Sequence, residues 1–410
     1  MAEGMVIVGA GECGTRAAFA LREAGYDGPV TLIGDEPHLP YERPPLSKEG
    51  MTAPTLAAKV IADEARLKAA GIDHRRGARV ASIDRDARRV LTAEGETLPY
   101  NRLLLATGAS PRRLVQEGAE VPHVAYLRTY DDARRIRDRL DAGARLIIVG
   151  GGFIGLELAA TAKSLGAEAT VVEVLPRLLA RAVPAEIAGI VADRHAAAGV
   201  TVVTGTPIAS IESAPDAVRL TLADGRRLEG DLLVAGIGAI PSTALAAAAG
   251  LVLDNGVAVD TRLATSDAAI FAAGDCCSFP LPIYGDRRVR LESWRSAQDH
   301  GNTVGRNMLG ADAPHAAVPW FWSDQYELTL QIAGLADEGR SSVRRELGEG
   351  AFIIFHLADD GRLVAASGIG TGNAVAKDIR IAEMLIGRGA RPDPGALAHP
   401  ETRLKSLLAA

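Results

Sequence analysis

The sequence contains the glycine pattern G-x-G-x-x-G twice, and each copy directly follows a short apolar run. In this pattern a buried strand turns tightly into a helix, and the amides at the start of that helix face a pyrophosphate. A single copy is a weak signal because glycines also cluster after strands for structural reasons, whereas two copies favour two dinucleotide sites. We therefore expect two βαβ units. The glycines of the two patterns are Gly9, Gly11 and Gly14, then Gly150, Gly152 and Gly155.

The region around the first pattern has the alternation expected of a βαβ unit. We predict a strand at 5–8, a helix at 12–24 and a second strand at 30–33. Acidic side chains follow this second strand at Asp35 and Glu36, and Asp35 lies 21 residues after the last glycine of the pattern. A carboxylate at this spacing can accept hydrogen bonds from an adenosine ribose.

The second pattern is followed by the same succession of features. A predicted strand at 145–149 leads into the glycines, a helix follows, and another strand at 169–172 ends at Glu173. Glu173 lies 18 residues after the last glycine, so the second copy is also complete with its own acidic residue.

Length, charge and cysteine content limit the class of protein. A chain of 410 residues exceeds what one hydrophobic core holds, so we expect two or three domains. The formal net charge of -6 argues against nonspecific binding of nucleic acid. The cysteines Cys13, Cys276 and Cys277 are too few and too oddly placed for a disulfide framework, and they fit a reducing cytoplasm. We therefore expect a cytoplasmic protein, and we assign no metal ligands.

One apolar stretch, Leu146–Ala162, raises the question of a membrane segment. It is shorter than the ~20 residues that span a bilayer, and it contains Glu157 and four glycines. The N-terminus also lacks a basic region before its first apolar run, so it is not typical of a signal peptide. We expect a buried strand, turn and helix here, and no association with a membrane.

Further segments carry structural information. Leu39–Lys48 contains tandem prolines, which favour an extended backbone and exclude a helix. Apolar strands are predicted to end at Thr107-Gly108 and at Gly274-Asp275. From about Pro319 strands predominate before one helix, which is typical of a separate α+β domain. The other predicted elements are a helix at 63–70, strands at 79–83, 89–92, 329–333, 352–357 and 363–367, and a helix at 375–386.

These motifs together resemble the FAD-dependent NADH:ferredoxin reductases that serve cytochrome P450 and Rieske dioxygenase systems, the putidaredoxin reductase type. The resemblance covers essentially the whole chain, and its proline segment and its Pro-Trp-Phe-Trp block are the most discriminating parts. The segments that carry it are 9–14, 40–48, 106–108, 150–157, 274–276, 291–293 and 319–326.

The resemblance implies an α/β fold with two Rossmann-like dinucleotide-binding domains, as in glutathione reductase, and a C-terminal α+β domain. It implies an FAD-binding domain formed by 1–112 and 239–318, an NAD-binding domain at 113–238 and the C-terminal domain at 319–410.

The resemblance also implies the residues that bind the cofactors. Those that would contact NADH lie around the second glycine pattern: Gly150, Gly152, Ile154, Gly155, Glu157 and Glu173. Those that would contact FAD are more widely spread: Gly9, Gly11, Cys13, Gly14, Asp35, Glu36, Arg43, Pro45, Lys48, Val80, Ala106, Thr107, Gly108, Arg128, Gly274, Asp275, Glu292, Ser293, Trp294 and Trp320.

Lys48, Glu157 and Trp320 are the predicted catalytic residues. Lys48 would lie beside the flavin ring, where an ammonium stabilises negative charge that develops on reduction; the alternative is a solvated surface lysine. Glu157 would orient the nicotinamide carboxamide, or it simply complements the dipole of its helix. Trp320 would lie between the flavin and the partner, or it is a core aromatic residue. Arg128 would donate to the pyrophosphate, unless it forms a surface salt bridge.

Glu173 bears on the choice of coenzyme. It should accept both hydroxyls of the adenosine ribose, and a 2′-phosphate would meet like charge there, which favours NADH over NADPH. Arg177 and Arg181 follow closely in sequence and could tolerate a phosphate.

The cysteine pattern bears on the electron acceptor. Disulfide reductases of related fold carry a redox-active pair, whereas Cys13 has no partner near it in sequence and Cys276-Cys277 are adjacent. We interpret Cys13 and Cys277 as small buried residues. Electrons would then leave from the flavin, after hydride transfer from NADH, in two single-electron transfers to a [2Fe-2S] ferredoxin.

The sequence allows alternatives for the ferredoxin-docking surface, the oligomeric state and the activity. A basic surface for a small acidic ferredoxin could come from the arginines at 287–295 or from those at 75–79, and the protein could be a monomer or a homodimer. The alternative activities are an NADH oxidase, a rubredoxin reductase, or a redox-responsive binding protein resembling apoptosis-inducing factor.

Overall fold

The computed structural model describes residues 4–53, 56–116 and 118–408, and it has a mixed α/β architecture. Over these ranges the chain forms two compact units. Unit 1 comprises Met1–Glu42, Lys59–Ser110 and Ile240–Pro319, and unit 2 comprises Arg43–Ala58, Pro111–Ala239 and Trp320–Ala410. The short strands β7 (Ala109–Pro111) and β16 (Ala239–Pro241) lie where the chain passes from one unit to the other.

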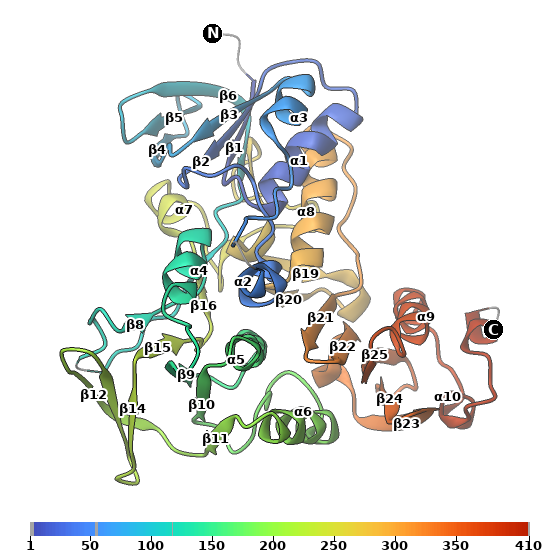
Figure 1. Cartoon of the computed structure of the whole chain (residues 1–410). Coiled ribbons are helices and arrows are strands. Elements are labelled where there is room, and N and C mark those ends of the chain that lie inside the picture. The colour runs from blue at the N-terminus through green and yellow to red at the C-terminus, as the bar shows by residue number, and fades with distance from the viewer. Residues whose placement is uncertain (1–3, 54–55, 117, 409–410) are drawn as a thin grey trace. The chain divides into compact units, whose positions relative to one another are not determined.

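The main sheet of unit 1 has seven strands among the described residues (Figure 1). Its order is β3-β2-β1-β6-β5-β4, and β18 pairs with β6. β1, β2, β3, β6 and β18 pair in parallel, whereas β4 and β5 form an antiparallel extension along the first half of β6. The strands are β1 (Gly4–Val8), β2 (Val30–Gly34), β3 (Ile72–Arg76), β4 (Val80–Asp84), β5 (Arg89–Thr92), β6 (Thr97–Leu105) and β18 (Ile270–Ala272).

Two long helices of unit 1, α1 (Glu12–Glu23) and α8 (Trp294–Asn307), pack closely against each other (Figure 1). Glycines on α8 make the close approach possible. A Cβ atom added at Gly301 would lie 2.7 Å from the Cys13 carbonyl oxygen, and one at Gly305 would lie 2.9 Å from the Ala17 carbonyl oxygen. This packing places the N-terminus of α8 beside the first glycine pattern.

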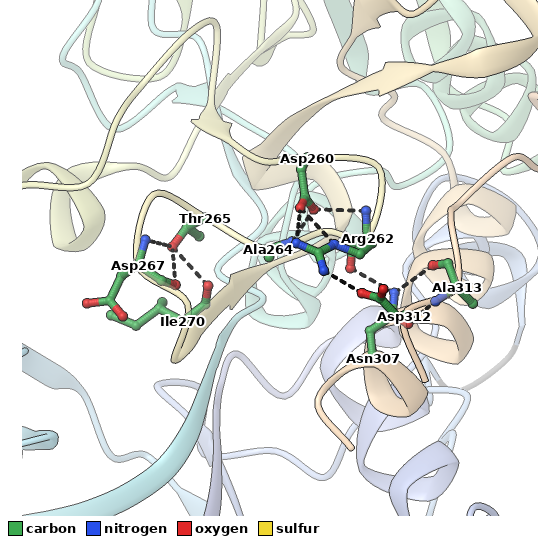
Figure 2. Close-up of polar contacts among 9 residues, drawn as sticks. All are labelled: Asp260, Arg262, Ala264, Thr265, Asp267, Ile270, Asn307, Asp312 and Ala313. Atoms are coloured by element: carbon green, nitrogen blue, oxygen red, sulfur yellow. Dashed lines mark hydrogen bonds and ion pairs between the residues drawn. The ribbon is translucent and has the colours of Figure 1, made fainter. Parts of the chain in front are cut away.

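A polar cluster holds the segment that leads into β18 (Figure 2). Asp260 accepts hydrogen bonds from the amides of Arg262 and Ala264, at 2.8 and 2.9 Å, and the Arg262 guanidinium also pairs with Asp312. Asn307, at the end of α8, donates 2.8 Å hydrogen bonds to the carbonyls of Arg262 and Ala313. The cluster therefore fixes the segment before β18 to the C-terminal end of α8. β18 in turn leads into the Gly274-Asp275 turn.

The remaining elements of unit 1 are short. A small sheet has the order β17-β19-β20. These elements are α3 (Glu64–Ala69), α7 (Ala244–Ala248), β17 (Val257–Ala258), the 3₁₀ turn η2 (Gly274–Cys276), β19 (Cys277–Leu281), the 3₁₀ turn η3 (Pro282–Tyr284) and β20 (Arg287–Val289).

Unit 2 contains a parallel sheet of order β11-β10-β9-β15-β8 and a small antiparallel sheet of order β12-β13-β14. The two sheets share one apolar core, in which Ile147, Val172, Leu220 and Leu233 are buried. The elements are β8 (Val124–Ala125), α4 (Tyr130–Arg137), β9 (Arg145–Val149), α5 (Phe153–Ser164), β10 (Glu168–Glu173), α6 (Ala185–Ala197), β11 (Thr201–Thr204), β12 (Ile208–Ser213), β13 (Val218–Leu222), β14 (Arg227–Gly230) and β15 (Leu232–Ala235).

The C-terminal part of unit 2 is an antiparallel sheet of order β21-β22-β25-β24-β23, on which α9 packs (Figure 1). Its elements are β21 (Trp320–Gln325), β22 (Leu328–Gly334), the 3₁₀ turn η4 (Ala336–Glu338), β23 (Ser341–Gly348), β24 (Ala351–Leu357), β25 (Leu363–Thr371), α9 (Ala376–Gly387), α10 (Pro394–Ala398) and the 3₁₀ turn η5 (Leu404–Leu408).

Most predicted elements are present with ends that differ by a few residues, and the α/β fold class with a C-terminal α+β domain is confirmed. The exclusion of a helix over Leu39–Lys48 is wrong at its end. Pro44–Ser47 forms a 3₁₀ turn, η1, and α2 (Glu49–Thr52) follows it. Proline is compatible with the first turn of a helix, because the amides there need no intrahelical acceptor.

No helix among the described residues is long and apolar enough to cross a membrane.

Arg345 on β23 holds the C-terminal tail to the sheet. Its side chain is 5% exposed, and its guanidinium lies 3.6 Å from Asp378 of α9. It donates hydrogen bonds of 2.7 to 3.2 Å to the backbone carbonyls of Leu397, His399, Pro400 and Thr402.

We expect Arg345→Leu to lower the free energy of unfolding by about 3 kcal/mol, because it leaves four tail carbonyls without their donor. Arg344→Leu is the matched control, since Arg344 is the exposed neighbour on the same strand and its pairs with Glu186 and Glu346 are at the surface. Urea unfolding followed by tryptophan fluorescence measures both changes. Equal losses in the two variants would contradict a specific role for Arg345.

Candidate functional site

The first glycine pattern forms a tight turn between β1 and α1. Gly9 has a φ of +113°, and a Cβ atom there would lie 2.1 Å from the Ala106 carbonyl oxygen. A Cβ atom at Gly14 would lie 1.9 Å from the Gly9 carbonyl oxygen, so strand and helix can pack only through glycine. At Gly11, in contrast, an added Cβ atom meets no described atom within 4 Å. A side chain would therefore clash at Gly9 and Gly14, whereas there is open space at Gly11.

The second glycine pattern has the same geometry between β9 and α5. Gly150 has a φ of +111°, and its added Cβ atom would lie 2.3 Å from the Gly236 carbonyl oxygen. That of Gly155 would lie 2.2 Å from the Gly150 carbonyl oxygen, whereas that of Gly152 meets no described atom within 4 Å. Gly11 and Gly152 are the N-caps of α1 and α5, and neither helix start is capped by a side chain.

The predicted residues of unit 1 gather at one edge of its parallel sheet. β1 ends just before Gly9, β2 before Asp35, β6 before Ala106, and β18 shortly before Gly274. Because the carboxyl ends of paired parallel strands meet at the same edge, these residues lie along one rim, which is where open α/β sheets bind ligands.

The contacts along this rim involve other predicted residues. The Thr107 hydroxyl donates a 2.7 Å hydrogen bond to the Ser242 carbonyl, and Gly108 follows with a φ of +68°. A Cβ atom at Gly274 would lie 3.1 Å from the Cβ atom of Cys13, so Asp275 follows a turn that rests on α1.

Further predicted residues lie on neighbouring segments. Asp35 is exposed, whereas Glu36 accepts a hydrogen bond from the Tyr41 hydroxyl. Half-buried Val80 begins β4. Ser293 caps α8 through the Ser296 amide, at 3.2 Å, directly before Trp294. The exposed Glu292 pairs with Arg290.

In unit 2, Lys48 and Glu157 form a buried ion pair. The Lys48 ammonium lies 3.2 Å from Glu157 Oε1, and the two side chains are 12% and 7% exposed. Hydroxyls of Ser47 and Ser323 donate to Glu157, at 2.7 Å to Oε2 and 2.6 Å to Oε1. Burial raises the pKa of Glu157 above its usual range, and these partners oppose the rise. Lys48 is therefore not a solvated surface lysine, and Glu157 has buried side-chain partners in addition to its place on α5.

Aromatic side chains of β21 extend this cluster. The Lys48 ammonium lies 5.3 Å from the centre of the Trp322 ring and 3.7 Å from an Asp324 carboxylate oxygen. Trp322 stacks on Trp320, with ring centres 5.4 Å apart and planes 23° apart. Trp320 and Trp322 are partly exposed, so Trp320 is not a fully buried core residue.

Other predicted residues of unit 2 lie on segments next to this cluster. The Arg43 guanidinium donates to the Arg128 carbonyl at 2.6 Å. Pro45 is buried within η1, and Ile154 at the start of α5 is 53% exposed.

The Glu173 carboxylate lies at the end of β10 beside the second glycine turn. It accepts hydrogen bonds from the amides of Gly151 and Leu175, at 2.7 and 2.8 Å, which fixes its position against the turn. The Arg177 guanidinium is engaged elsewhere: it donates 3.0 to 3.3 Å hydrogen bonds to the carbonyls of Leu178, Leu179, Ala180 and Val183. Both terminal nitrogens of Arg177 are therefore directed at backbone carbonyls, and its part in tolerating a phosphate stays a prediction.

The arginines considered for a docking surface are largely balanced by nearby carboxylates. Of the first group, Arg288, Arg290 and Arg295 pair with acidic side chains within unit 1. Of the second group, Arg75 and Arg76 do the same. The location of a docking surface stays a prediction.

Ser47, Ser323 and Asp324 were not predicted as site residues. Ser47 directly precedes Lys48, so its place in the proline segment could have indicated it. Ser323 and Asp324 are distant in sequence from Lys48 and Glu157, and only the tertiary fold brings Ser323 to Glu157 and Asp324 to Lys48.

Comparison with protein families agrees with this geometry. The profile of the pyridine nucleotide-disulphide oxidoreductases matches residues 4–301, and that of the reductase C-terminal domain matches residues 320–408. The chain belongs to the pyridine nucleotide-disulphide oxidoreductases.

This oxidoreductase has similar relatives along nearly its whole length. One relative is the ferredoxin–NAD(+) reductase component of the anthranilate 1,2-dioxygenase system from Burkholderia cepacia. The two sequences are 42% identical over 413 residues, and the match covers 99% of this chain and 100% of that protein. It is 39% identical over 371 residues to putidaredoxin reductase from Pseudomonas putida, covering 87% and 86% of the two chains.

A third relative and a solved structure complete the comparison. A rubredoxin–NAD(+) reductase from Pseudomonas putida is 39% identical over 332 residues, covering 80% of this chain and 86% of that protein. The crystal structure of the ferredoxin reductase for the CYP199A2 system from Rhodopseudomonas palustris matches with a TM-score of 0.93 and 37% identity, covering 98% and 99% of the chains.

Family membership implies the cofactors FAD and NADH, and the residues of the two glycine turns fit two dinucleotides. At each turn the protein leaves space over the middle glycine and an uncapped helix start, and a carboxylate follows the next strand. These are the features that a pyrophosphate and a ribose require. Cys13, Cys276 and Cys277 are free and buried, and burial was predicted for Cys13 and Cys277.

Because there is open space over the middle glycines, alanine at either position should impair cofactor binding without disturbing the fold. Gly11→Ala should leave a folded protein that no longer retains FAD, because its methyl group enters the space of the pyrophosphate. Gly152→Ala should retain FAD and bind NADH at least tenfold more weakly. Flavin absorbance after purification and NADH titration measure the two effects, and circular dichroism reports the fold.

Gly14→Ala is the contrasting variant, since its methyl group would clash with the Gly9 carbonyl and should disturb folding itself. Normal retention of FAD by Gly11→Ala would refute the assignment of the first turn.

Proposed function

We propose that the protein is an NADH-dependent flavoprotein reductase that supplies electrons, through FAD, to a [2Fe-2S] ferredoxin serving a cytochrome P450 or Rieske-type oxygenase in the cytoplasm. In the overall reaction NADH and two oxidised ferredoxins give NAD⁺, a proton and two reduced ferredoxins. The observation that carries the proposal is similarity along the whole chain to a ferredoxin–NAD(+) reductase component. We retain the boundaries 1–112 with 239–318 for the FAD domain, 113–238 for the NAD domain and 319–410 for the C-terminal domain as part of the proposal.

The state of the cysteines supports an acceptor other than a disulfide. Burial raises the pKa of Cys13 and of Cys277 well above the ordinary value, and it raises that of Cys276. A thiol exchanges with disulfides as its thiolate, so these cysteines are poor nucleophiles. Electrons would therefore leave this oxidoreductase without passing through a cysteine pair.

The residues of the two units have separate tasks in this proposal. Bound FAD supplies the redox chemistry, since it exchanges a hydride with NADH and single electrons with a ferredoxin. Gly11 and Asp35 would hold FAD by its pyrophosphate and ribose, and Gly152 and Glu173 would hold NADH in the same way. FAD contacts from Arg43, Pro45, Lys48 and Arg128 stay predictions.

The Lys48–Glu157 pair would orient the nicotinamide. The ionised Glu157 carboxylate can accept a hydrogen bond from a carboxamide, and the pair places a buried positive charge next to it. The rigid surroundings of the pair, with two serine donors and an aromatic ring, limit its motion. Trp320 would lie on the route by which electrons reach the ferredoxin.

The test is an electron-transfer assay on the purified, flavin-loaded protein. We expect fast reduction of cytochrome c by NADH only when a [2Fe-2S] ferredoxin such as putidaredoxin is added, and slow consumption of oxygen without it. Trp320→Ala should slow ferredoxin reduction at least tenfold more than it slows flavin reduction in stopped-flow absorbance. Flavin that is not reduced by NADH would refute the proposal, and equal effects of Trp320→Ala on both steps would refute the exit role.

Rubredoxin reduction is the second candidate, because a rubredoxin–NAD(+) reductase is among the relatives. The same assay with rubredoxin in place of ferredoxin decides between them. Fast oxygen consumption with no added carrier would instead indicate an NADH oxidase.

Glu173 should determine the preference for NADH. We expect Glu173→Ala to raise the KM for NADH about tenfold and to reduce discrimination against NADPH, since it removes ribose acceptors and a negative charge. Glu168→Ala is the control, because Glu168 is an exposed carboxylate at the other end of β10. The ratio of kcat/KM for the two coenzymes is the measurement, and an unchanged ratio in Glu173→Ala would contradict this role.

A further inference from the structure

Buried polar side chains lead from Glu157 toward the surface of unit 2. Ser323 and Gln325 lie on β21, and His195 lies in the last turn of α6. These three side chains belong to residues that are 0%, 1% and 0% exposed. Buried polar groups are costly unless they are hydrogen-bonded, so their arrangement requires a physical account.

The hydrogen bonds among them run in one direction. An ionised Glu157 only accepts, so Ser323 must donate its hydroxyl proton to Oε1, at 2.6 Å. Ser323 Oγ is then left to accept from the Gln325 amide nitrogen, at 3.2 Å. This turns Gln325 Oε1 toward His195 Nε2, at 2.9 Å, so that Nε2 carries the ring proton. His195 Nδ1 then accepts from the Tyr326 hydroxyl, at 3.4 Å.

Tyr326 is the last residue of this hydrogen-bond chain, which runs from Glu157 through Ser323, Gln325 and His195. Burial raises the pKa of Tyr326 to about 12, so its hydroxyl keeps its proton at neutral pH. Its ring lies 5.0 Å from that of His195 and 4.0 Å from the Arg194 guanidinium. Its backbone has a φ of +56°, a conformation that non-glycine residues rarely adopt. Tyr326 begins the two-residue turn between β21 and β22, and from there its hydroxyl can donate to His195.

We propose that His195 and Gln325 are positioning residues for Glu157: through Ser323 they direct a hydrogen-bond donor at its carboxylate and so hold it ionised and correctly oriented. The inference deepens the proposed function, because it rests on the role of Glu157 toward the nicotinamide. It gives α6 and β21 a part in the reaction with NADH, although neither element belongs to a glycine turn.

The charged groups around Glu157 determine in which direction its pKa moves when the Ser323 hydrogen bond is lost. Glu157 faces the Lys48 ammonium and the hydroxyls of Ser47 and Ser323, and Asp324 faces the other side of that ammonium. Burial raises the pKa of Glu157 and these donors lower it. Loss of the Ser323 donor therefore moves the pKa of Glu157 upward.

His195 faces a different set of groups at the outer end of the chain. These are the Gln325 amide, the Tyr326 hydroxyl and the positive charge of Arg194, which itself pairs with Glu327 at 2.7 Å. Burial, together with Arg194, lowers the pKa of His195, and the hydrogen bond with Gln325 opposes this, so the surroundings favour the neutral ring whose tautomer these hydrogen bonds require.

Two substitutions of Gln325 test the proposal. Gln325→Leu removes the donor to Ser323, which frees Ser323 to turn away from Glu157. Gln325→Glu keeps the shape but offers a competing acceptor, so the Ser323 hydroxyl must divide between two carboxylates. In both variants we expect the pKa of Glu157 to rise by about one unit.

The first measurement is the carboxyl ¹³C chemical shift of Glu157 against pH, in flavin-loaded protein labelled with ¹³C-glutamate. Glu157→Gln assigns the signal. The second is the rate of flavin reduction by NADH against pH, whose acid limb should move upward by the same amount. His195→Leu should shift both measurements in the same direction by a smaller amount.

His356→Leu is the matched control. His356 is a histidine of the C-terminal sheet that lies 3.2 Å from the Ser367 hydroxyl, and it takes no part in the chain to Glu157. It should change stability without moving the Glu157 titration.

The outcomes separate the inference from the proposed function. A Glu157 titration that is the same in wild type, Gln325→Leu and Gln325→Glu would overturn the inference even if NADH reduces the flavin normally. A wild-type flavin that NADH does not reduce would refute the proposed function, whereas the carboxyl titration would still decide whether the chain acts on Glu157. If Gln325→Leu does not fold, the isosteric Gln325→Glu provides the same decision.

Discussion

The buried pair of Lys48 and Glu157 is the interaction on which unit 2 depends. Two charges removed from water are costly, and their attraction offsets that cost only when further donors complete the geometry. Ser47, Ser323 and the Trp322 ring supply those partners. The pair thus ties the proline segment, α5 and β21, which are distant in sequence, to one point.

The two glycine turns show the same physical solution used twice. In each, a Cβ atom would strike a carbonyl at the first and third glycines and would meet no described atom at the middle one. The protein therefore excludes its own side chains from the space that a pyrophosphate needs, and it leaves the helix amides uncapped toward that space. A carboxylate follows the next strand in each unit, where it could meet a ribose. We propose FAD for the first turn and NADH for the second.

The C-terminal sheet takes part in the proposed chemistry as well as in stability. β21 contributes Trp320 and Trp322 on one side of the ion pair and the buried Ser323 and Gln325 on the other. Because side chains alternate along a strand, one short strand can serve both tasks. The buried cysteines, in contrast, have raised pKa values and form no disulfide, which supports the proposal that this pyridine nucleotide-disulphide oxidoreductase transfers electrons without a disulfide of its own.

Local patterns were sufficient for much of this protein. The glycine spacing, the apolar strands and the acidic residues after them predicted both βαβ units, because each depends on residues within about 30 positions of one another. The sequence also showed Glu157 as a polar residue in an apolar stretch, but it could not show its partners. Ser323, Gln325 and His195 reach Glu157 only after β21 and α6 have packed against α5, and hydrogen bonds between such distant segments leave no periodic signal in a single sequence. The 3₁₀ turn at Pro44–Ser47 was missed for a related reason, since proline is compatible with the first turn of a helix as well as with an extended chain. The sequence by itself therefore determined the two glycine turns and the acidic residues after the next strands, and only the tertiary structure decided which groups surround Glu157, because those groups come from segments far apart in the chain.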